Sequence, residues 1–374
     1  MLERRGKRIV CIGGGTGLAT LLRGIKGFVG KAQDNKHYLD LDSLTAVVTM
    51  ADDGGTTASL IDQFGVLPPG DIRACLVALS EEEGLINQLF THRIEGQGEL
   101  AGQIFGNLLL TALVQMNSGN LIAAIQDASR VLRAKGTILP ATTEYVILAA
   151  RLADGTYLKG ETSFSPSPNR SPIAEVFFAQ RNGNGEPKKY VPSALPEAVE
   201  AIRAADAIIL GPGGLYTSIV PVLLISELAD TISHAHAQRV FIANVMTQPG
   251  KTDSFSVANH IAELRKYGGF NIDHVLVNNR IISPEILARY KEEGQTQVLL
   301  SETDADISAR ISFSGRGTMS LVEGAILHLA DVIEEVPETS VSKEVAGISQ
   351  KTVLRHNPVK LATALEELLS STQD

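Results

Sequence analysis

The sequence contains no tryptophan and only two cysteines, Cys11 and Cys75, among its 374 residues. Two cysteines cannot build a disulfide framework or a zinc site made of cysteines, so we expect a buried, reduced pair. Long apolar runs are also missing. The basic N-terminus is followed by only Ile9–Ile12 before glycines begin, which is too short for a signal-peptide core, and no later stretch approaches a membrane span. We therefore expect a cytoplasmic protein without membrane insertion.

Positive charge is scarce as well. The 33 lysines and arginines are outnumbered by 42 acidic residues, which gives a net charge of −9. A protein with this charge has no basic surface to attract a phosphate backbone, which argues against a general nucleic-acid binder. A local basic pocket for one small anion remains compatible with the composition. Hydrophobic residues make up 44% of the chain and charged residues 20%, a balance that allows a buried core and argues against disorder.

One unit recurs along the chain: a short apolar run, a turn with glycine or asparagine, and then a helical pattern. We expect the apolar runs to be strands, at 8–12, 44–50, 206–210, 239–243 and 274–277. Strands that alternate with helices form a mostly parallel sheet covered on both faces. The pattern predicts an α/β protein with a Rossmann-like, doubly wound, mostly parallel sheet, in a single domain over residues 1–374.

Two regions depart from this rhythm. Residues 84–134 read as consecutive helices, a helical insertion in which Leu108–Leu113 is apolar all round and is expected to be buried. Residues 144–192 read as strands, with Asp154-Gly155 as a hairpin signal before a strand at 156–164. We expect the second region to be an antiparallel β excursion within the same domain.

Glycines crowd the turn after the first expected strand, in Gly13–Gly17. Glycine lets a backbone approach a phosphate, and a helix N-terminus directs N–H groups at it. The dinucleotide pattern G-x-G-x-x-G fails in either register, because Leu18 or Thr20 takes its sixth place, and the P-loop pattern is absent. A site for NAD or a standard ATPase site is therefore not expected. The alternative is a tight strand–helix turn without a ligand.

Adjacent carboxylates, Asp52 and Asp53, follow the second expected strand. Neighbouring carboxylates repel each other unless a cation or hydrogen-bond donors satisfy them. A Mg²⁺ ion held by one or two carboxylates together with substrate phosphate is one interpretation, and capping of the next helix is the other. Asp71 is likewise a natural helix cap, whereas Arg73 in the same first turn opposes the helix dipole. Arg73 therefore indicates that an anion, or Asp52 or Asp53, lies opposite it, with an ordinary surface arginine as the alternative.

A second glycine turn, Gly211–Ser218, leads into another helix, with Tyr216 available for stacking and Thr217 and Ser218 as hydroxyl donors. Uncharged donors and acceptors follow further strands, at Asn244, Thr247, Gln248, Asn278 and Asn279. Loops at the carboxyl ends of strands face one crevice in an open α/β sheet. The combination predicts a site for a phosphorylated, hydroxyl-rich ligand such as a nucleotide or a nucleotide-sugar.

Other arrangements carry less information. His234 and His236 lie two residues apart on an expected helix, where they do not share a face, so we expect both at the surface. No G-x-S-x-G elbow and no Ser/His/Asp order is present. The run His356–Leu361 opens a last helix, which explains it structurally, and Lys360 is placed to reach the site.

Six segments occur in order: Gly13–Gly17, Ala51–Gly55, Pro68–Arg73, Gly102–Leu109, Gly211–Ser218 and Asn244–Gly250. Together they resemble the bacterial gluconeogenesis factors, a family in the same superfamily as the phospholactate transferases of deazaflavin-cofactor synthesis. The resemblance runs from Lys7 to about Leu369. It implies a Rossmann-like fold, a cytoplasmic location and binding of a UDP-sugar, typically UDP-N-acetylglucosamine.

The resemblance further implies a role in cell shape and in envelope precursor supply during growth on gluconeogenic carbon, with no established catalytic reaction. Partners would include cell-envelope regulatory proteins, and we expect a homo-oligomer. The transferase branch instead uses a nucleotide-diphosphate-linked donor and Mg²⁺. Our first hypothesis is a UDP-sugar-binding regulatory protein, and the second is a Mg²⁺-dependent transferase of the phospholactate type.

Three departures from the family pattern bear on this choice. Gln103 stands where a histidine usually precedes the Gly-Asn pair, Gly214 replaces a common serine, and Thr56–Ala58 replaces a more usual Ser-Thr-Gly. The missing histidine and serine favour binding over catalysis. An aromatic-lined pocket for a deazaflavin precursor is also poorly supplied, with 7 tyrosines and 11 phenylalanines.

The expected cofactors are thus limited to Mg²⁺, without NAD, haem or zinc. The expected metal ligands are Asp53 and Asp71, with Asp52 as a further candidate. The residues expected to contact the ligand are Gly13, Gly14, Gly15, Thr16, Gly17, Gly54, Gly55, Arg73, Asn107, Gly211, Gly213, Gly214, Tyr216, Thr217, Asn244, Thr247, Gln248 and Asn278.

Overall fold

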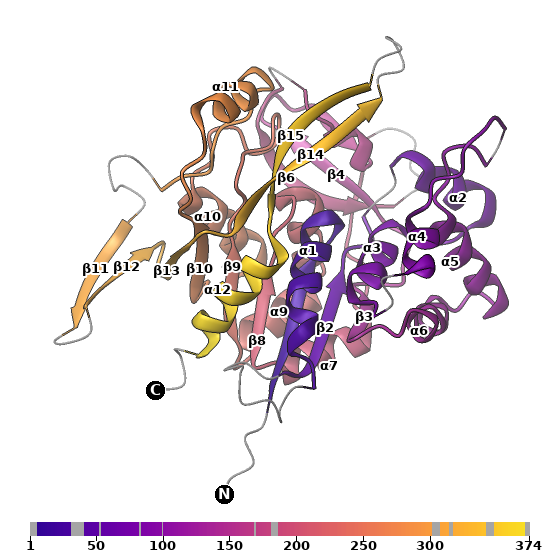
Figure 1. Cartoon of the computed structure of the whole chain (residues 1–374), viewed down its shortest axis with the longest axis horizontal. Coiled ribbons are helices and arrows are strands. Elements are labelled where there is room, and N and C mark those ends of the chain that lie inside the picture. The colour runs from indigo at the N-terminus through magenta and orange to yellow at the C-terminus, as the bar shows by residue number, and fades with distance from the viewer. Residues whose placement is uncertain are drawn as a thin grey trace, which may run out of the picture.

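The computed structural model describes residues 6–30, 41–51, 54–81, 84–98, 100–167, 170–180, 186–300, 307–313, 317–341 and 348–370. Within these residues a nine-stranded sheet forms the centre of the protein (Figure 1). Its order is β11 (Ile307–Phe313), β12 (Gly317–Val322), β13 (Ala325–Ala330), β10 (His274–Asn278), β9 (Gln238–Ile242), β8 (Ala207–Leu210), β1 (Lys7–Gly13), β2 (Leu41–Val48) and β3 (Thr137–Pro140).

All neighbours from β13 to β3 are parallel, and only the pairs β11–β12 and β12–β13 at one edge of the described sheet are antiparallel. The chain moves outward from β1 to β2 and β3, and then returns to β8 and proceeds in the opposite direction. The strand order therefore reverses between β1 and β8. This topology confirms the predicted doubly wound α/β fold, and the reversal is where such folds bind ligands.

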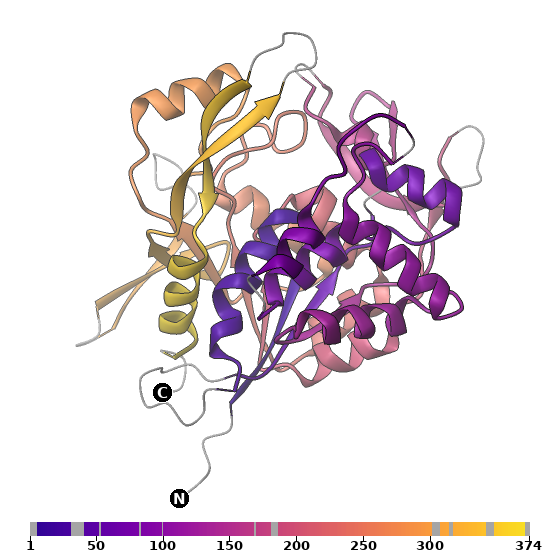
Figure 2. The ribbon, with the colours of Figure 1, turned by 45° about the vertical axis from the view of Figure 1, so that its right-hand side comes forward.

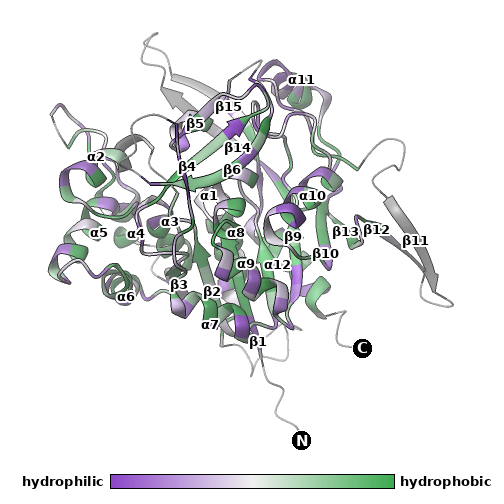
Figure 3. Ribbon diagram, turned by 180° about the vertical axis from the view of Figure 1, so that it is seen from behind, coloured by the Kyte–Doolittle hydropathy of each residue, from purple (hydrophilic) through white to green (hydrophobic). Residues whose placement is uncertain are grey.

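Helices cover both faces of the sheet (Figures 1 and 3). One face carries α1 (Gly15–Ile25), α3 (Gly70–Leu79) and α12 (Pro358–Ser370), and the other carries α7 (Pro196–Ala204), α9 (Ser226–His234) and α10 (Val257–Gly268). Strand β1 shows why both faces are needed. Its residues alternate between two hydrophobic cores, with Ile9 and Cys11 in one and Val10 and Ile12 in the other.

The helical insertion is present as predicted, beside α2 (Gly55–Phe64). It comprises α4 (Leu85–Thr91), α5 (Phe105–Met116) and α6 (Leu121–Leu132). The expectation that Leu108–Leu113 is wholly buried is wrong, because Leu110 and Thr111 are buried but Ala112 is exposed. Helix α5 lies near the outside of the molecule, so only one of its faces packs inward (Figure 1).

The antiparallel excursion is also present. Its strands pair in the order β5 (Tyr157–Lys159), β4 (Ile147–Leu152), β6 (Ile173–Ala179) and β7 (Lys189–Tyr190). At the predicted hairpin, Asp154 accepts a hydrogen bond of 2.9 Å from the backbone N–H of Thr156. The strand expected at 156–164 ends early, because Gly160 adopts a φ of +82° and a 3₁₀ turn, η2 (Glu161–Phe164), follows.

The helix expected after the second glycine turn is broken into a π-helical turn η3 (Leu215–Ile219), a short α8 (Val220–Leu223) and α9. Pro221 lacks the N–H that a continuous helix needs, which explains a break at this point. Within the described residues no single helix is both long and apolar enough to cross a membrane. The pair Leu215–Leu223 and Ser226–His234 reaches that length only together and is bent by 79°.

A two-stranded ribbon, β14 (Ile333–Val341) and β15 (Ile348–His356), was not expected from the sequence. It rises from α12 and arches over the carboxyl edge of the sheet toward α11 (Pro284–Glu292) (Figure 2). The remaining short element, η1 (Lys26–Phe28), extends α1. Cys11 and Cys75 are buried and form no disulfide, and His234 and His236 are exposed, as predicted.

Candidate functional site

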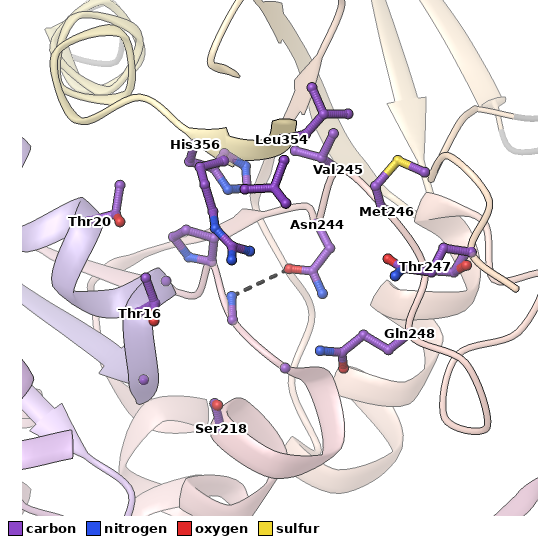
Figure 4. A pocket seen from close by; sticks show the side chains of 18 of the residues that line it. Thr16, Thr20, Ser218, Asn244, Val245, Met246, Thr247, Gln248, Leu354 and His356 are labelled. Atoms are coloured by element: carbon purple, nitrogen blue, oxygen red, sulfur yellow. Dashed lines mark hydrogen bonds between the residues drawn. The ribbon is translucent and has the colours of Figure 1, made fainter. Parts of the chain in front are cut away.

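A cavity of about 420 Å³ lies where the strand order reverses. The glycine loops after β1 and β8 border it, the segment after β9 forms a further wall, and α11 and β15 complete it (Figure 4). It is lined by Gly14, Gly15, Thr16, Gly17, Thr20, Pro212, Gly213, Gly214, Ser218, Asn244, Val245, Met246, Thr247, Gln248, Tyr290, Glu293, Gln295, Lys351, Val353, Leu354, Arg355 and His356. The structure thus brings together three of the sequence segments that were expected to share one crevice.

The two glycine loops pack directly against each other. A Cβ atom on Gly17 would lie 2.3 Å from the carbonyl oxygen of Pro212, so α1 can approach the second loop only with glycine here. A Cβ atom on Gly14 would lie 2.3 Å from Oδ2 of Asp71. Part of the glycine content of Gly13–Gly17 is therefore required by packing, independently of any ligand.

Asp71 does not cap its helix. Helix α3 begins at Gly70 with Pro69 at the N-cap and no side-chain capping bond, and Asp71 lies within its first turn. Its carboxylate is directed at Gly14 of the first glycine loop, so it lies beside the N-terminus of α1. Asp52 and Asp53 lie outside the described residues. Among the residues that are described, no group of three or more His, Cys, Asp or Glu side chains is arranged to hold a metal ion.

Arg73 and Asn107 are bonded to each other, and neither lines the cavity. The Nε of Arg73 donates a hydrogen bond of 2.9 Å to Oδ1 of Asn107. Gly106 makes this pairing possible, since a Cβ atom there would lie 2.8 Å from Cδ of Arg73. The Gly-Asn pair of α5 therefore positions an arginine from α3. Beside it, Gln103 is buried and its Oε1 has no hydrogen-bond partner in the described chain.

The wall after β9 carries uncharged polar side chains. Oδ1 of Asn244 accepts a long hydrogen bond of 3.4 Å from the N–H of Gly213, drawn as the dashed line in Figure 4. The hydroxyl of Thr247 accepts a hydrogen bond of 2.9 Å from the N–H of Thr296. Gln248 is different, because its Oε1 is buried without a partner among the described residues. An acceptor in this state is available to a ligand that carries a donor.

Several expected site residues do not line the cavity. Tyr216 is 1% exposed and packs edge-on against Phe255 in the core, so the expectation that it stacks on a ligand is not met. The side chain of Asn278 bonds the backbone of Arg280 and shapes the turn after β10. Lys360 donates to Asp331 at 2.6 Å instead of reaching the site. Gly13, Gly55 and Gly211 belong to the loops without lining the space itself, and Gly54 and Thr217 line a neighbouring cavity.

The sequence analysis missed the contribution of α11 and β15. The hydroxyl of Tyr290 accepts a hydrogen bond of 2.8 Å from the backbone N–H of Leu354, which ties the two elements together. Lys351 and Glu293 bridge them again at 3.2 Å. Five lining residues, Lys351, Val353, Leu354, Arg355 and His356, come from the end of β15. The available signal was the polar pair Arg355-His356 directly after the apolar pair Val353-Leu354.

His356 supplies a neutral imidazole to the cavity. Burial lowers its pKa to about 4, and a hydrogen bond to the backbone of Ala243 opposes the shift only in part. Its Nε2 is buried without a hydrogen-bond partner within the described chain. The cavity thus contains two buried polar atoms, on Gln248 and His356, that find no partner in the described residues, and they come from elements far apart in the sequence.

Comparison with known proteins shows which family this chain belongs to. A family model described as 2-phospho-L-lactate transferase CofD matches residues 9–312. The gluconeogenesis factor of Halalkalibacterium halodurans is 36% identical over 362 residues, which is 96% of each chain. That of Listeria innocua is 38% identical over 331 residues, or 88% of this chain and 94% of the relative. This chain belongs to the gluconeogenesis factor family, within the wider CofD family.

The fold of this gluconeogenesis factor is shared by a solved relative. A crystal structure of a Bacillus halodurans protein superposes with a TM-score of 0.76 at 34% identity, and the match covers 96% of this chain and 99% of that one. The transferase model ends at residue 312, whereas the alignment with the H. halodurans factor covers 96% of this chain and so extends into the ribbon. The part of the cavity formed by β15 therefore lies beyond the transferase match.

Proposed function

We propose that this gluconeogenesis factor binds a nucleotide-sugar of the UDP-N-acetylglucosamine type and acts as a regulatory protein rather than through a reaction of its own. The observation that carries the proposal is the cavity of about 420 Å³ at the strand reversal, bordered by two glycine loops and walled by amides and hydroxyls. Such a cavity suits a ligand that combines phosphates with many hydroxyl groups.

The loops and α1 would hold the diphosphate. Helix α1 starts at Gly15 without a side-chain cap, so its first N–H groups are not satisfied by a capping residue. Anions are stabilised at such a helix start. The polar wall with Asn244 and Gln248 would bond the sugar or the base, and Val353 and Leu354 of β15 supply an apolar surface on the other side.

The chemistry of the side chains that line the cavity supports a regulatory role. The neutral His356 has lost the proton affinity that a general base near pH 7 requires, because its pKa lies at about 4. Its Nε2 and the Oε1 of Gln248 instead need partners, which bound ligand groups would provide. The ribbon that brings His356 to the cavity links ligand occupancy to an element at the surface, where a partner protein could sense it.

A Mg²⁺-dependent transferase is the second candidate. It is favoured by the carboxylate of Asp71 against the first glycine loop and by the family match over residues 9–312. Mg²⁺ is commonly held by one or two carboxylates together with substrate phosphates. In this case Asp71 and Asp53 would hold the metal beside the diphosphate, and the ligand would be consumed.

A ligand panel separates these functions. We expect UDP-N-acetylglucosamine or a related UDP-sugar to raise the thermal unfolding midpoint, by an amount equivalent to about 2.7 kcal/mol at 100 times the dissociation constant, whereas NAD and ATP leave it unchanged. Stabilisation by NAD alone would overturn the proposal. Chromatography of the bound ligand after prolonged incubation with Mg²⁺ then distinguishes a binder, which returns it intact, from a transferase.

The cellular role can be tested by complementation. In a bacterium that lacks its own gluconeogenesis factor, this chain should restore normal cell shape on gluconeogenic carbon. A variant that folds but does not bind the nucleotide-sugar should fail to do so. Equal rescue by both proteins would separate the cellular role from ligand binding.

A further inference from the structure

A groove of about 370 Å³ lies on the helical insertion and shares no lining residue with the main cavity. It is bordered by the end of α2, the end of α5, the start of α6 and the segment that leads into β4. Figure 1 shows α2, α5 and α6 together at one side of the molecule, away from α11. We call this space the insertion groove. It is lined by Phe64, Gly65, Val66, Leu67, Val114, Gln115, Gly119, Leu121, Thr143 and Tyr145.

The insertion groove presents apolar side chains to solvent. Phe64 is 47% exposed, and Leu67 is half-buried. Val114 and Leu121 are buried and form the floor. Single exposed apolar residues are ordinary, but apolar groups gathered around a hollow are typical of a contact site for another molecule. A groove of this size accepts a large apolar side chain from outside.

The rim of the groove favours positive charge. Helix α2 ends at Phe64 and α5 ends at Met116, and neither helix has a basic residue in its last turn. A helix C-terminus carries a partial negative charge, which cations stabilise. Asp62, which is exposed in the last turn of α2, adds a carboxylate of the same sign. Helix α6 begins at the groove, but Asn120 caps its positive end by accepting a hydrogen bond of 3.1 Å from the N–H of Ala123.

The neighbouring side chains do not reverse this balance. Among the described residues, no lysine or arginine lines the groove. Glu144 is bonded to Tyr190, and Asp127 is paired with Arg130. Over residues 55–132, the sequence contains eight acidic residues, three arginines and no lysine, a net charge of −5. More than half of the net charge of −9 therefore falls within about a fifth of the chain.

We propose that the insertion groove docks a segment of a partner protein in which a large apolar side chain is flanked by lysine or arginine. The apolar side chain fills the groove, and its basic neighbours meet the two helix C-termini and Asp62. A buried anchor of this kind supplies most of the affinity, while complementary charges at the rim supply specificity and speed of association.

A partner of opposite charge suits the groove better than a second copy of this chain. Two copies that each carry a net charge of −9 repel each other, whereas a basic segment is attracted to the acidic insertion. The proposal goes beyond the function proposed above, because none of its observations depends on what the main cavity binds.

The test selects peptides from a random library, displayed on phage, against the full chain. We expect the enriched peptides to carry a large apolar residue next to lysine or arginine. A selected peptide, synthesised with a fluorescent label, should bind saturably in anisotropy titrations, and its affinity should decrease as the salt concentration rises. Failure to enrich any peptide, or enrichment of acidic peptides, overturns the proposal.

Two substitutions test whether the selected peptide binds at the groove. Phe64→Ser should weaken binding by about tenfold or more, because the apolar contact is lost. Gln115→Arg, at an exposed lining residue, should weaken it several-fold, because it adds a cation at the rim. The matched controls are Leu85→Ser and Gln88→Arg, at exposed residues of α4 outside the groove, and they should leave the affinity unchanged. Thermal unfolding shows that each variant is folded.

Peptide affinity that is unchanged in Phe64→Ser and Gln115→Arg, or that the controls weaken equally, overturns the proposal. Sedimentation of the full chain tests the alternative occupant. A wild-type dimer that Phe64→Ser dissociates would assign the groove to a second copy and would also overturn the proposal. The same oligomeric state in the wild type and in Phe64→Ser supports a partner of another kind.

Discussion

The hydroxyl of Tyr290 on α11 accepts a hydrogen bond of 2.8 Å from the backbone N–H of Leu354 on β15. This contact joins the helix after β10 to the ribbon that arches over the sheet, 64 residues later in the chain. Both residues line the main cavity. The ligand space is therefore closed by a tertiary contact between two elements that lie outside the glycine loops.

Loss of this contact should loosen the cavity wall. In Tyr290→Phe the buried N–H of Leu354 has no acceptor, and a buried donor without a partner costs about 1–3 kcal/mol. We expect the free energy of unfolding, measured by denaturant titration, to decrease by an amount in that range. The affinity for the UDP-sugar, measured by calorimetry, should fall several-fold. Tyr157→Phe, at a partly exposed tyrosine of β5, is the control and should change neither. Equal affinity in both variants would show that the ribbon does not shape the site.

The sequence predicted the glycine loops well because the relevant signals are local. A short apolar run followed by Gly13–Gly17 or Gly211–Ser218 marks a strand end, and parallel strands bring their carboxyl ends to one edge. The ribbon could not be predicted in this way. Ile333 pairs with His356 across an antiparallel ladder, and the contribution of β15 to the cavity depends on how that ladder arches over the sheet.

Tyr216 illustrates a different limit. Every residue from Leu215 to Ile219 is buried, so the turn has no exposed face from which the direction of a side chain could be inferred. The turn is also π-helical, which changes the angular spacing of side chains relative to an α-helix. Asp71 shows the opposite case, since both of its interpretations were open in the sequence, and the structure excludes only the N-cap, because Pro69 takes that position and Asp71 faces Gly14.

Two glycines that look alike in the sequence should behave differently. In Gly213→Ala the new Cβ would meet its nearest atom, Cβ of Ser218, at 3.4 Å, so we expect little change in the free energy of unfolding. If the backbone of this loop contacts phosphate, the same methyl group should reduce UDP-sugar affinity at least tenfold. Gly27→Ala is the matched control for replacing a glycine with alanine, because no atom lies within 4 Å of the Cβ that this substitution adds. Unchanged affinity in Gly213→Ala would mean that the second loop is only a turn.

Gly17→Ala should instead damage the fold. Its Cβ would lie 2.3 Å from the carbonyl oxygen of Pro212, and backbone cannot move aside as a flexible side chain does. Overpacking of this kind typically costs about 1–3 kcal/mol, so the unfolding midpoint should drop clearly relative to Gly213→Ala. Equal stability of the two variants in denaturant titrations would contradict the packing of α1 against the second loop.

Asp71 should be responsible for the effect of Mg²⁺ on ligand binding. In Asp71→Asn the carboxylate beside Gly14 is lost, and we expect UDP-sugar affinity to become independent of Mg²⁺ while the affinity without metal is kept. Glu197→Gln is the matched control, because Glu197 also lies in the first turn of a helix, α7. Each substitution removes a favourable interaction of a carboxylate with the helix dipole, worth about 0.3–1 kcal/mol. Mg²⁺ dependence that persists in Asp71→Asn would exclude a metal at this carboxylate.

The stability of the protein should fall with acidification because of His356. Burial lowers the pKa of His356 from its ordinary 6.5 to about 4, so between these values the unfolded chain binds a proton that the native chain does not. The free energy of unfolding therefore decreases as the pH falls from about 6.5 to about 4, by up to about 3 kcal/mol from this one residue. Above pH 6.5 the imidazole is neutral in both states, and the contribution stays constant.

His356→Gln should remove this share of the pH dependence. Glutamine does not titrate, so the free energy of unfolding should depend less steeply on pH between pH 4 and 6.5. Part of the pH dependence should remain, because burial also lowers the pKa of His328 to about 4. Urea titrations at several pH values measure the slope, and His234→Gln, at an exposed histidine of α9, is the control. A bound UDP-sugar that contacts the neutral Nε2 of His356 should extend this decline to lower pH in the wild type, because the ligand contact lowers the pKa of His356 further. The same slope in the wild type and in His356→Gln, with and without ligand, would show that His356 is not held neutral at the cavity.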